Sequence, residues 1–161
     1  MTNFFQGSLI KKIVFGVVIL VLIWILWSIF GGENRETREI LELPDGQIEI
    51  VNEDGDELTL EVKMGSSAVN LSGVNPKVIE ETVIYITSRY PASAARTYGD
   101  IKADIEVAFF GPDRTILSIH EIPEEESQTI TPEQKYQHVL IAPAGLFKDK
   151  DISVENGSKI K

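Results

Sequence analysis

Apolar and polar positions divide the chain into two unlike parts. Residues 13–30 carry no charge, and only Gly16 and Ser28 interrupt their apolar run. From residue 46 onward, short segments alternate apolar and polar side chains, which is the pattern of half-buried β-strands. The pattern therefore predicts one N-terminal transmembrane helix followed by a small β-rich domain.

The apolar run has the length of a helix that spans a bilayer. Its 18 residues would form a helix about 27 Å long, close to the thickness of the hydrocarbon core. A cleaved signal peptide has a shorter apolar region that ends in small residues. Here the run ends in Trp27-Ser28-Ile29-Phe30, so we expect an uncleaved anchor.

The charges beside this helix predict its orientation. Each flank holds two basic residues, but Lys11 and Lys12 adjoin the helix directly, whereas acidic residues are mixed with the basic ones on the other side. Because basic residues favour the cytoplasmic side, we expect a single-pass protein of the bacterial inner membrane. Its predicted parts are a cytoplasmic N-terminus (1–12), a transmembrane helix (13–30), a charged stalk (31–45) and a periplasmic β-rich domain (46–161).

Trp24 and Trp27 lie three residues apart and therefore share one face of the predicted helix. They fit an aromatic belt at the membrane–water interface or a face that packs on another membrane helix. The run holds no pair of small residues four positions apart, because Gly16 stands alone. It therefore gives no strong signal for self-dimerisation.

The second part predicts about seven short strands separated by turns. The strand-like segments are 47–51, 57–62, 82–87, 104–110, 115–121 and 138–142, with an edge strand at 152–154. Asp54-Gly55 and the tetrapeptide 111–114 have the composition of hairpin turns, and Asn75 before Pro76 is typical of the start of a helical turn. The expected fold is mostly β, a small barrel-like or sandwich domain with short helical turns.

Composition excludes several classes of function. The chain holds 15 Lys and Arg against 25 Asp and Glu, a net charge of −10. This excess of negative charge argues against nucleic-acid binding, which depends on basic residues. The absence of Cys excludes disulfides, iron–sulfur clusters and Cys-based zinc sites, and His120 and His138 are too few for a His-based metal centre. We expect no metal and no cofactor.

No catalytic motif is present in the sequence. It contains no phosphate-binding glycine loop, no Gly-x-Ser-x-Gly and no His-Glu-x-x-His. Ser118 and His120 are the nearest nucleophile–base pair, since they share a strand face. A polar outer face opposite Leu117 and Ile119 explains them without catalysis. We therefore expect no catalytic residues and no enzymatic activity.

Three segments carry a resemblance to a known family. They are the strand–turn–strand IEVAFFGPDRTILSIHE (105–121), the strand YQHVLIAPAG (136–145) and VENGSKI (154–160). Together they resemble domain of unknown function 192, a bacterial and archaeal family of small β-rich domains without established activity. The family's Trp-Met-Lys-Asn-Thr stretch is replaced here by residues 97–101. The resemblance therefore implies that a ligand site at that stretch is lost, which favours a structural or binding role.

These features predict an accessory or structural subunit, anchored by one helix, whose periplasmic domain docks on or stabilises a larger membrane complex. Respiratory, photosynthetic, secretory and envelope complexes are the candidate partners. Tyr90, Arg96 and Tyr98 are the predicted interface, because Tyr and Arg are favoured there; Trp24 and Trp27 are the predicted helix-packing face. The alternative is a tethered periplasmic module that binds a ligand or a glycan.

Overall fold

The computed structural model describes residues 17, 19–21, 34–52, 54–66, 69–155 and 157–161. The chain divides into two compact units, Met1–Glu33 and Asn34–Lys161. The four described residues of the first unit are helical; most of the predicted transmembrane segment, including Trp24 and Trp27, lies outside the described residues. Within the described residues, we find no helix of the length and apolar character needed to cross a membrane.

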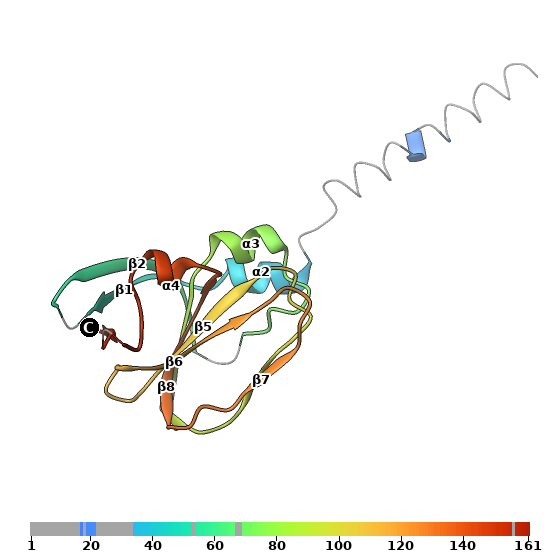
Figure 1. The fold of residues 1–161 in the computed structure, drawn as a ribbon. Coiled ribbons are helices and arrows are strands. Elements are labelled where there is room, and N and C mark those ends of the chain that lie inside the picture. Colours follow the sequence, from blue (N-terminus) through green and yellow to red (C-terminus); the bar gives the residue numbers. More distant parts are fainter. Residues whose placement is uncertain (1–16, 18, 22–33, 53, 67–68, 156) are drawn as a thin grey trace, which may run out of the picture. The chain divides into compact units, whose positions relative to one another are not determined.

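The second unit is mostly β, which confirms the predicted fold class of this part of the chain. Its helices are α2 (Arg35–Leu41), α3 (Pro76–Glu81) and α4 (Leu146–Asp149). Its strands are β1 (Asp45–Val51), β2 (Glu57–Gly65), β3 (Ile84–Ala92), β4 (Arg96–Tyr98), β5 (Ile105–Phe110), β6 (Ile116–Ile122), β7 (Gln128–Ile130), β8 (Tyr136–Pro143) and β9 (Lys159–Ile160). Seven of these strands form one sheet in the order β6-β5-β8-β3-β2-β1-β9, and β4 pairs with β7 in a separate ribbon (Figure 1).

The large sheet curls until its two edges meet at one end. Thr115, just before β6, bridges Lys159 of β9, and the backbone N–H of Ile116 donates to the carbonyl of Ser158 at 2.9 Å. We call this contact the seam. Beyond the seam, β6 pairs with β5 alone among the described strands. The result is a curled half-barrel in which most of β6 remains an open edge.

Both faces of the central strands are buried, in two separate hydrophobic clusters. The first cluster covers the face beneath α2 and α3, and it includes Ile40, Ile79, Ile84, Ile86, Ile105, Val107, Phe109, Val139 and Ile141. The second lies inside the curl, and it includes Ile48, Ile50, Leu60, Val62, Tyr85, Phe110, Leu140, Phe147 and Ile160. Two-sided burial explains why β5 is apolar at every position except Glu106.

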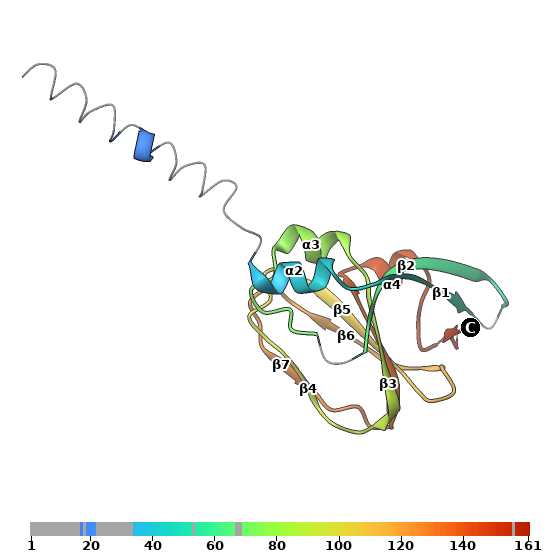
Figure 2. The same ribbon diagram turned by 180° about the vertical axis from the view of Figure 1, so that it is seen from behind.

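The stretch predicted as a charged stalk, 31–45, belongs from Asn34 onward to the folded unit, so that prediction is corrected here. The side chain of Asn34 caps α2 by accepting from the backbone N–H of Thr37 at 3.1 Å. Thr37 is fully buried, and its hydroxyl accepts from the N–H of Asn75 at 2.8 Å. Ile40 is 2% exposed in the first cluster. Figure 2 shows α2 beside α3 on one side of the sheet. The charged residues occupy the outer face of α2, which is why composition alone indicated a stalk.

Several elements differ from the sequence expectation. The predicted edge strand at 152–154 is absent, and β9 at 159–160 takes that place. The ribbon of β4 and β7 is not predicted, because its strands have only three residues each and hold polar pairs such as Thr97 and Thr129, whose hydroxyls lie 2.9 Å apart. Helix α4 was not predicted, because its first turn depends on a residue far along the chain: the backbone N–H of Phe147 donates to a carboxylate oxygen of Glu106 on β5.

Candidate functional site

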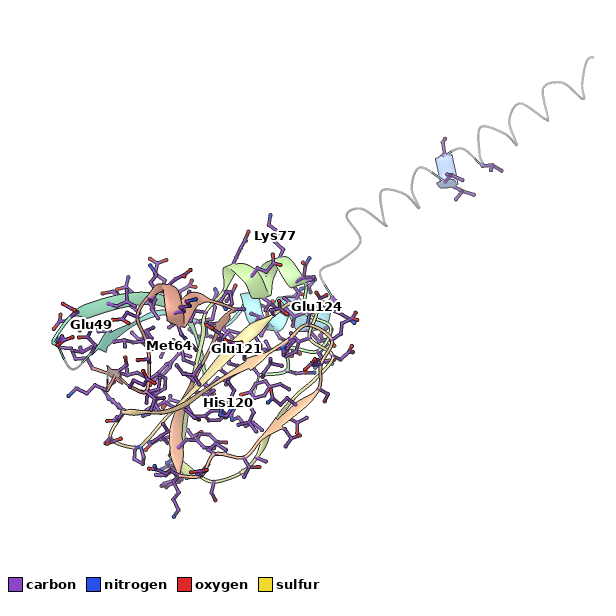
Figure 3. The ribbon with its side chains drawn as sticks, in the orientation of Figure 1. Glu49, Met64, Lys77, His120, Glu121 and Glu124 are labelled. Carbon is purple, nitrogen blue, oxygen red and sulfur yellow. The ribbon has the colours of Figure 1, made fainter. Side chains whose placement is uncertain are left out.

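A pocket of about 450 Å³ opens beside the seam. It draws residues from β1, β2, β3, the β5–β6 turn and the end of β9. Its lining residues are Gln47, Ile48, Glu49, Thr59, Met64, Tyr85, Arg114, Ile160 and Lys161. We call it the seam pocket; Glu49 and Met64 are labelled in Figure 3. Its volume lies in the range of small-molecule sites, which often occur at the mouths of β-barrels.

One wall of the seam pocket holds a buried hydrogen-bonded pair. The Tyr85 hydroxyl lies 2.7 Å from Nδ1 of His138 on β8, and Oγ1 of Thr87 lies 3.1 Å from the same nitrogen. Burial raises the pKa of Tyr85. Burial, together with the nearby charge of Arg114, lowers the pKa of His138. The phenol therefore stays protonated and the imidazole neutral at pH 7, so the contact is a hydrogen bond between two neutral groups whose direction is set by the tautomer of His138.

Arg114 enters the pocket from a strained position in the β5–β6 turn. Its φ of +67° lies in the left-handed region, which glycine occupies far more readily. The turn is closed by the N–H of Arg114, which donates to the carbonyl of Gly111 at 3.0 Å. Nη1 of Arg114 donates to the backbone carbonyl of Lys161 at 2.8 Å. In the part of the chain that the structure describes, no Asp or Glu side chain forms an ion pair with Arg114, and the backbone oxygen of Lys161 is the partner of its guanidinium.

The other charged groups of the pocket are already paired. Nζ of Lys161 lies 2.7 Å from Oε1 of Glu57 and 3.5 Å from Oε2 of Glu49. These carboxylates, chiefly Glu57, raise the pKa of Lys161. Arg114 is therefore the one cation lining this pocket that no described Asp or Glu side chain engages.

A larger depression, of about 530 Å³, lies across β1, β2 and the segment before β3. Its walls include Asp45, Glu61, Glu81 and a single cation, Lys63. Nζ of Lys63 is engaged by Asp45 at 2.7 Å and by the carbonyl of Leu41 at 3.1 Å. Since its cation is occupied, this depression offers less for ligand recognition than the seam pocket does.

The open edge of β6 is the second notable surface. Its sequence, Ile116–Ile122, contains neither Lys nor Pro, the residues that commonly prevent pairing at strand edges. A β-bulge opposite Phe109 and Phe110 shifts the alternation of β6, so Leu117 packs on the first cluster and Ile119 on the second. The expectation that Leu117 and Ile119 share one face is therefore wrong.

Ser118 and His120, which were expected to share a strand face, do meet on this edge. Nε2 of His120 lies 3.0 Å from Oγ of Ser118, and burial lowers the pKa of His120. The His120 ring, labelled in Figure 3, also packs edge-on against Phe109, and the two ring centroids lie 5.9 Å apart. Among the described residues, no carboxylate hydrogen bonds to His120, so the third group that orients a catalytic histidine is not supplied.

The residues predicted as an interface do not form one patch. Tyr90 is 69% exposed, with the Arg89 guanidinium 5.4 Å from its ring centre. Arg96 instead lies over the ring of Tyr136 and donates from Nε to its hydroxyl at 3.2 Å. Tyr98 is 6% exposed and belongs to the first cluster. The prediction is corrected for Tyr98, because β4 turns its side chain toward the core.

Tyr98 provides a test of this burial. Its hydroxyl has no hydrogen-bond partner among the described residues, and burial raises the pKa of Tyr98 to about 12. Because an unsatisfied buried hydroxyl is destabilising, Tyr98→Phe is expected to raise the free energy of unfolding by about 0.5–1 kcal/mol. Urea denaturation of the purified protein measures this change.

Tyr136→Phe is the matched control, since the Tyr136 hydroxyl donates to the carbonyl of Ala94 at 3.0 Å and accepts from Arg96. That variant is expected to lose about 1 kcal/mol. Equal losses for the two variants would show that the Tyr98 hydroxyl is satisfied.

The lowered pKa of His138 predicts that the folded protein becomes less stable in acid. This pKa is lowered in the folded state, so the unfolded chain takes up a proton first as the pH falls. The free energy of unfolding should therefore be highest above about pH 7 and decrease as the pH falls below about 6.5. His120 acts with the same sign. Urea midpoints at about pH 7.5 and about pH 5.5 should differ less in His138→Gln than in the parent protein. An unchanged difference would show that His138 is not the group that titrates.

Acidic residues do not form a metal site in the described parts of the chain, where no group of three or more His, Asp or Glu converges. Glu106, which is only 4% exposed, has a structural role instead. Its Oε2 accepts from the backbone N–H of Phe147 at 3.0 Å and so holds the start of α4.

Tyr85, Arg114 and His138 belong to no motif in the sequence and were not predicted as site residues. One local signal for Arg114 exists, because an arginine occupies the last place of the turn Gly111-Pro112-Asp113-Arg114, where glycine is usual. The Tyr85–His138 pair gives no local signal, since the two residues lie 53 positions apart.

Comparison with known proteins shows the fold alone. The sequence matches no protein-family model and no curated protein. It is similar in structure to a Sinorhizobium meliloti 1021 protein provisionally described as a transcription regulator, with a TM-score of 0.63 and 15% identity over 74% of this chain and 94% of that one. It is also similar to a protein of unknown function from Novosphingobium aromaticivorans, with a TM-score of 0.59 and 16% identity over 74% of this chain and 86% of that one.

Proposed function

We propose that the protein is an accessory subunit, tethered to the bacterial inner membrane, whose β domain docks on a larger membrane complex through the open edge of β6. The observation that carries this proposal is the length of β6 beyond Ile116, which pairs with β5 alone among the described strands. An exposed strand edge presents backbone N–H and C=O groups that an extended segment of another protein can pair with. The resemblance to domain of unknown function 192, a family without established activity, is compatible with such a role.

The side chains of β6 favour addition of a strand. Leu117 and Ile119 are only half-buried, one on each side of the sheet. A partner strand beside β6 would cover both and extend the two clusters. This gain in apolar burial would add to the hydrogen bonds of the new strand pair. The docking surface thus moves from the dispersed set Tyr90, Arg96 and Tyr98 to β6.

The tether rests on the apolar run 13–30. Its four described residues, 17 and 19–21, are all apolar, helical and exposed within the chain. Contiguous exposed apolar side chains are unfavourable in water and are covered in a membrane. We retain the predicted orientation, with residues 1–12 in the cytoplasm and the β domain in the periplasm, and a helix-packing role for Trp24 and Trp27.

A charged side chain on the open edge tests the docking role. Ser118→Lys places an ammonium group on β6 without removing an apolar side chain, and a lysine at a strand edge opposes pairing with another strand. We expect this variant to enter the membrane and unfold cooperatively like the parent protein, but to co-purify with its complex in mild detergent at a small fraction of the parent level.

The matched control is Thr129→Lys, on the exposed ribbon strand β7. It adds the same charge away from β6 and should leave co-purification unchanged. The proposal fails if Ser118→Lys co-purifies as well as Thr129→Lys, or if the parent protein runs alone in mild detergent.

A further inference from the structure

The open edge of β6 ends at a cluster of acidic side chains, which we call the acidic end. Glu121 lies near the end of the strand, and Glu124, Glu125 and Glu126 follow in the turn after it; all four are exposed. Figure 3 labels Glu121 and Glu124. We infer that the segment that pairs with β6 is an extended strand with lysine or arginine residues at one end, beside these glutamates. This inference rests on the proposed docking of β6 and specifies the chemistry of the partner.

Most of the negative charge at the acidic end is uncompensated. Nζ of Lys102 lies 3.2 Å from Oε1 of Glu125 and is shared with a further carboxylate. In the described parts of the chain, no Lys or Arg forms an ion pair with Glu121, Glu124 or Glu126. Basic residues of a partner strand would therefore meet unpaired carboxylates. Complementary charges of this kind select the correct partner and its register more than they add affinity.

Glu121 also faces a second carboxylate across the strand pair. In the register of β5 and β6 it lies opposite Glu106, whose buried side chain accepts from the N–H of Phe147. Like charges directly opposite each other in a sheet are destabilising. Lys148 lines the depression beside both glutamates, but within the described residues it forms no ion pair with either. A basic residue opposite Glu121 on an added strand would reduce this repulsion.

The turn that carries the other glutamates is held against the sheet. The N–H of Glu124 donates to Oδ1 of Asp104 at 2.6 Å, and the N–H of Glu125 donates to the carbonyl of Ile101 at 2.8 Å. Asp104 directly precedes β5, so the turn is fixed to the strand beside β6. Because this backbone is fixed, the carboxylates stay at one end of the open edge. The basic residues of the partner are therefore expected at one end of its strand and not throughout it.

Amide chemical shifts test the inference on the full chain, labelled with nitrogen-15 and held in nanodiscs of zwitterionic lipid. The probes are short peptides of alternating valine and threonine, with a run of lysines, glutamates or serines at the N-terminal or the C-terminal end. Lysines at the end that lies beside Glu121 should strengthen binding at least about fivefold over serines, and glutamates there should weaken it. The shifts should centre on β6, and the preference for lysine should decrease in high salt.

Protein variants separate the effect of charge from the effect of the strand edge. Glu124→Lys combined with Glu126→Lys should abolish the preference for lysine, while the serine peptides bind as they do to the parent protein. Asp54→Lys combined with Glu61→Lys makes the same change of charge at exposed positions of the β1–β2 hairpin, and it should keep the preference. Ser118→Lys, on the edge itself, should weaken the binding of every peptide.

Several results would overturn the inference. Lysine peptides that bind no more tightly than serine peptides would show that the glutamates only protect the edge from pairing. An equal gain from lysines at either end would show general attraction to the net charge of −10. A preference that survives Glu124→Lys with Glu126→Lys, or the absence of shifts in β6, would also refute it. Co-purification of Ser118→Lys with the native complex decides the docking itself, so the preference for lysine can fail while that docking stands.

Discussion

Replacement of Phe109 by alanine is expected to lower the free energy of unfolding by about 3–5 kcal/mol. Phe109 has no exposed surface, and its ring meets Tyr136 edge-on, with centroids 4.9 Å apart. Alanine would remove that contact and leave a cavity. The surrounding strands cannot close on it freely, because β5 and β8 also carry the second cluster on their opposite faces.

Urea denaturation of the Phe109 variants measures this cost. Phe109→Leu keeps most of the volume and should lose about 1–2 kcal/mol. Because His120 of β6 packs against the Phe109 ring, amide protons of β6 should also exchange faster in Phe109→Ala. Equal costs for the alanine and leucine variants would contradict the central position that the structure assigns to Phe109.

Removal of α2 is expected to lower the free energy of unfolding of the β domain by about 2–4.5 kcal/mol, the sum of one buried side chain and one hydrogen bond. A fragment that begins at residue 43 loses the buried side chain of Ile40 and the hydrogen bond from the N–H of Asn75 to Thr37. Burial of an isoleucine contributes about 1.5–3 kcal/mol and a hydrogen bond about 0.5–1.5 kcal/mol. A fragment that begins at Asn34 keeps both, so it should melt cooperatively at a clearly higher temperature.

Ile40→Ala in the longer fragment separates the two contributions and should account for most of the loss. If fragments starting at 34 and at 43 have the same melting temperature, α2 contributes nothing to the fold. The interpretation of residues 31–45 as a stalk would then be restored.

Elements whose residues act locally could be predicted from the sequence. The alternation in β1 and β2, with Gly55 at φ +87° between them, describes a hairpin that the structure contains. Asn75 and Pro76 likewise identify the start of α3, where the Asn75 side chain accepts from the N–H of Lys77 at 3.0 Å. In each case the hydrogen bonds that form the element join residues close together in the chain, so the local sequence is sufficient to predict the element.

Features that depend on distant parts of the chain could not be predicted. The seam joins Thr115 to Lys159, and β9 has only two residues, too few for any periodicity. The β-bulge in β6 places Leu117 and Ile119 on opposite faces of the sheet, and no feature of the local sequence indicates where this bulge lies. Tyr98 was predicted to lie in an exposed interface because Tyr and Arg are favoured at interfaces, but its position in the ribbon turns its side chain into the first cluster.

The candidate sites also divide into one that depends on neighbouring residues and one that depends on distant parts of the chain. The Ser118–His120 contact was foreseeable, because two residues at a spacing of two share one face of a strand. The seam pocket was not, since it assembles residues from Gln47 to Lys161 only after the sheet has curled. Among the residues that line the seam pocket, Arg114 has an unusual local sequence context, because it occupies a turn position that favours glycine.

The docking of β6 on a membrane partner is the central claim, and photo-crosslinking in native membranes tests it most directly. A benzophenone amino acid at position 118 lies on the open edge, whereas the same group at position 129 lies on the ribbon. Irradiation should give one discrete adduct from position 118, joined to an extended segment of another membrane protein, and none from position 129. Absence of an adduct at position 118, or equal adducts at both positions, would contradict docking through β6.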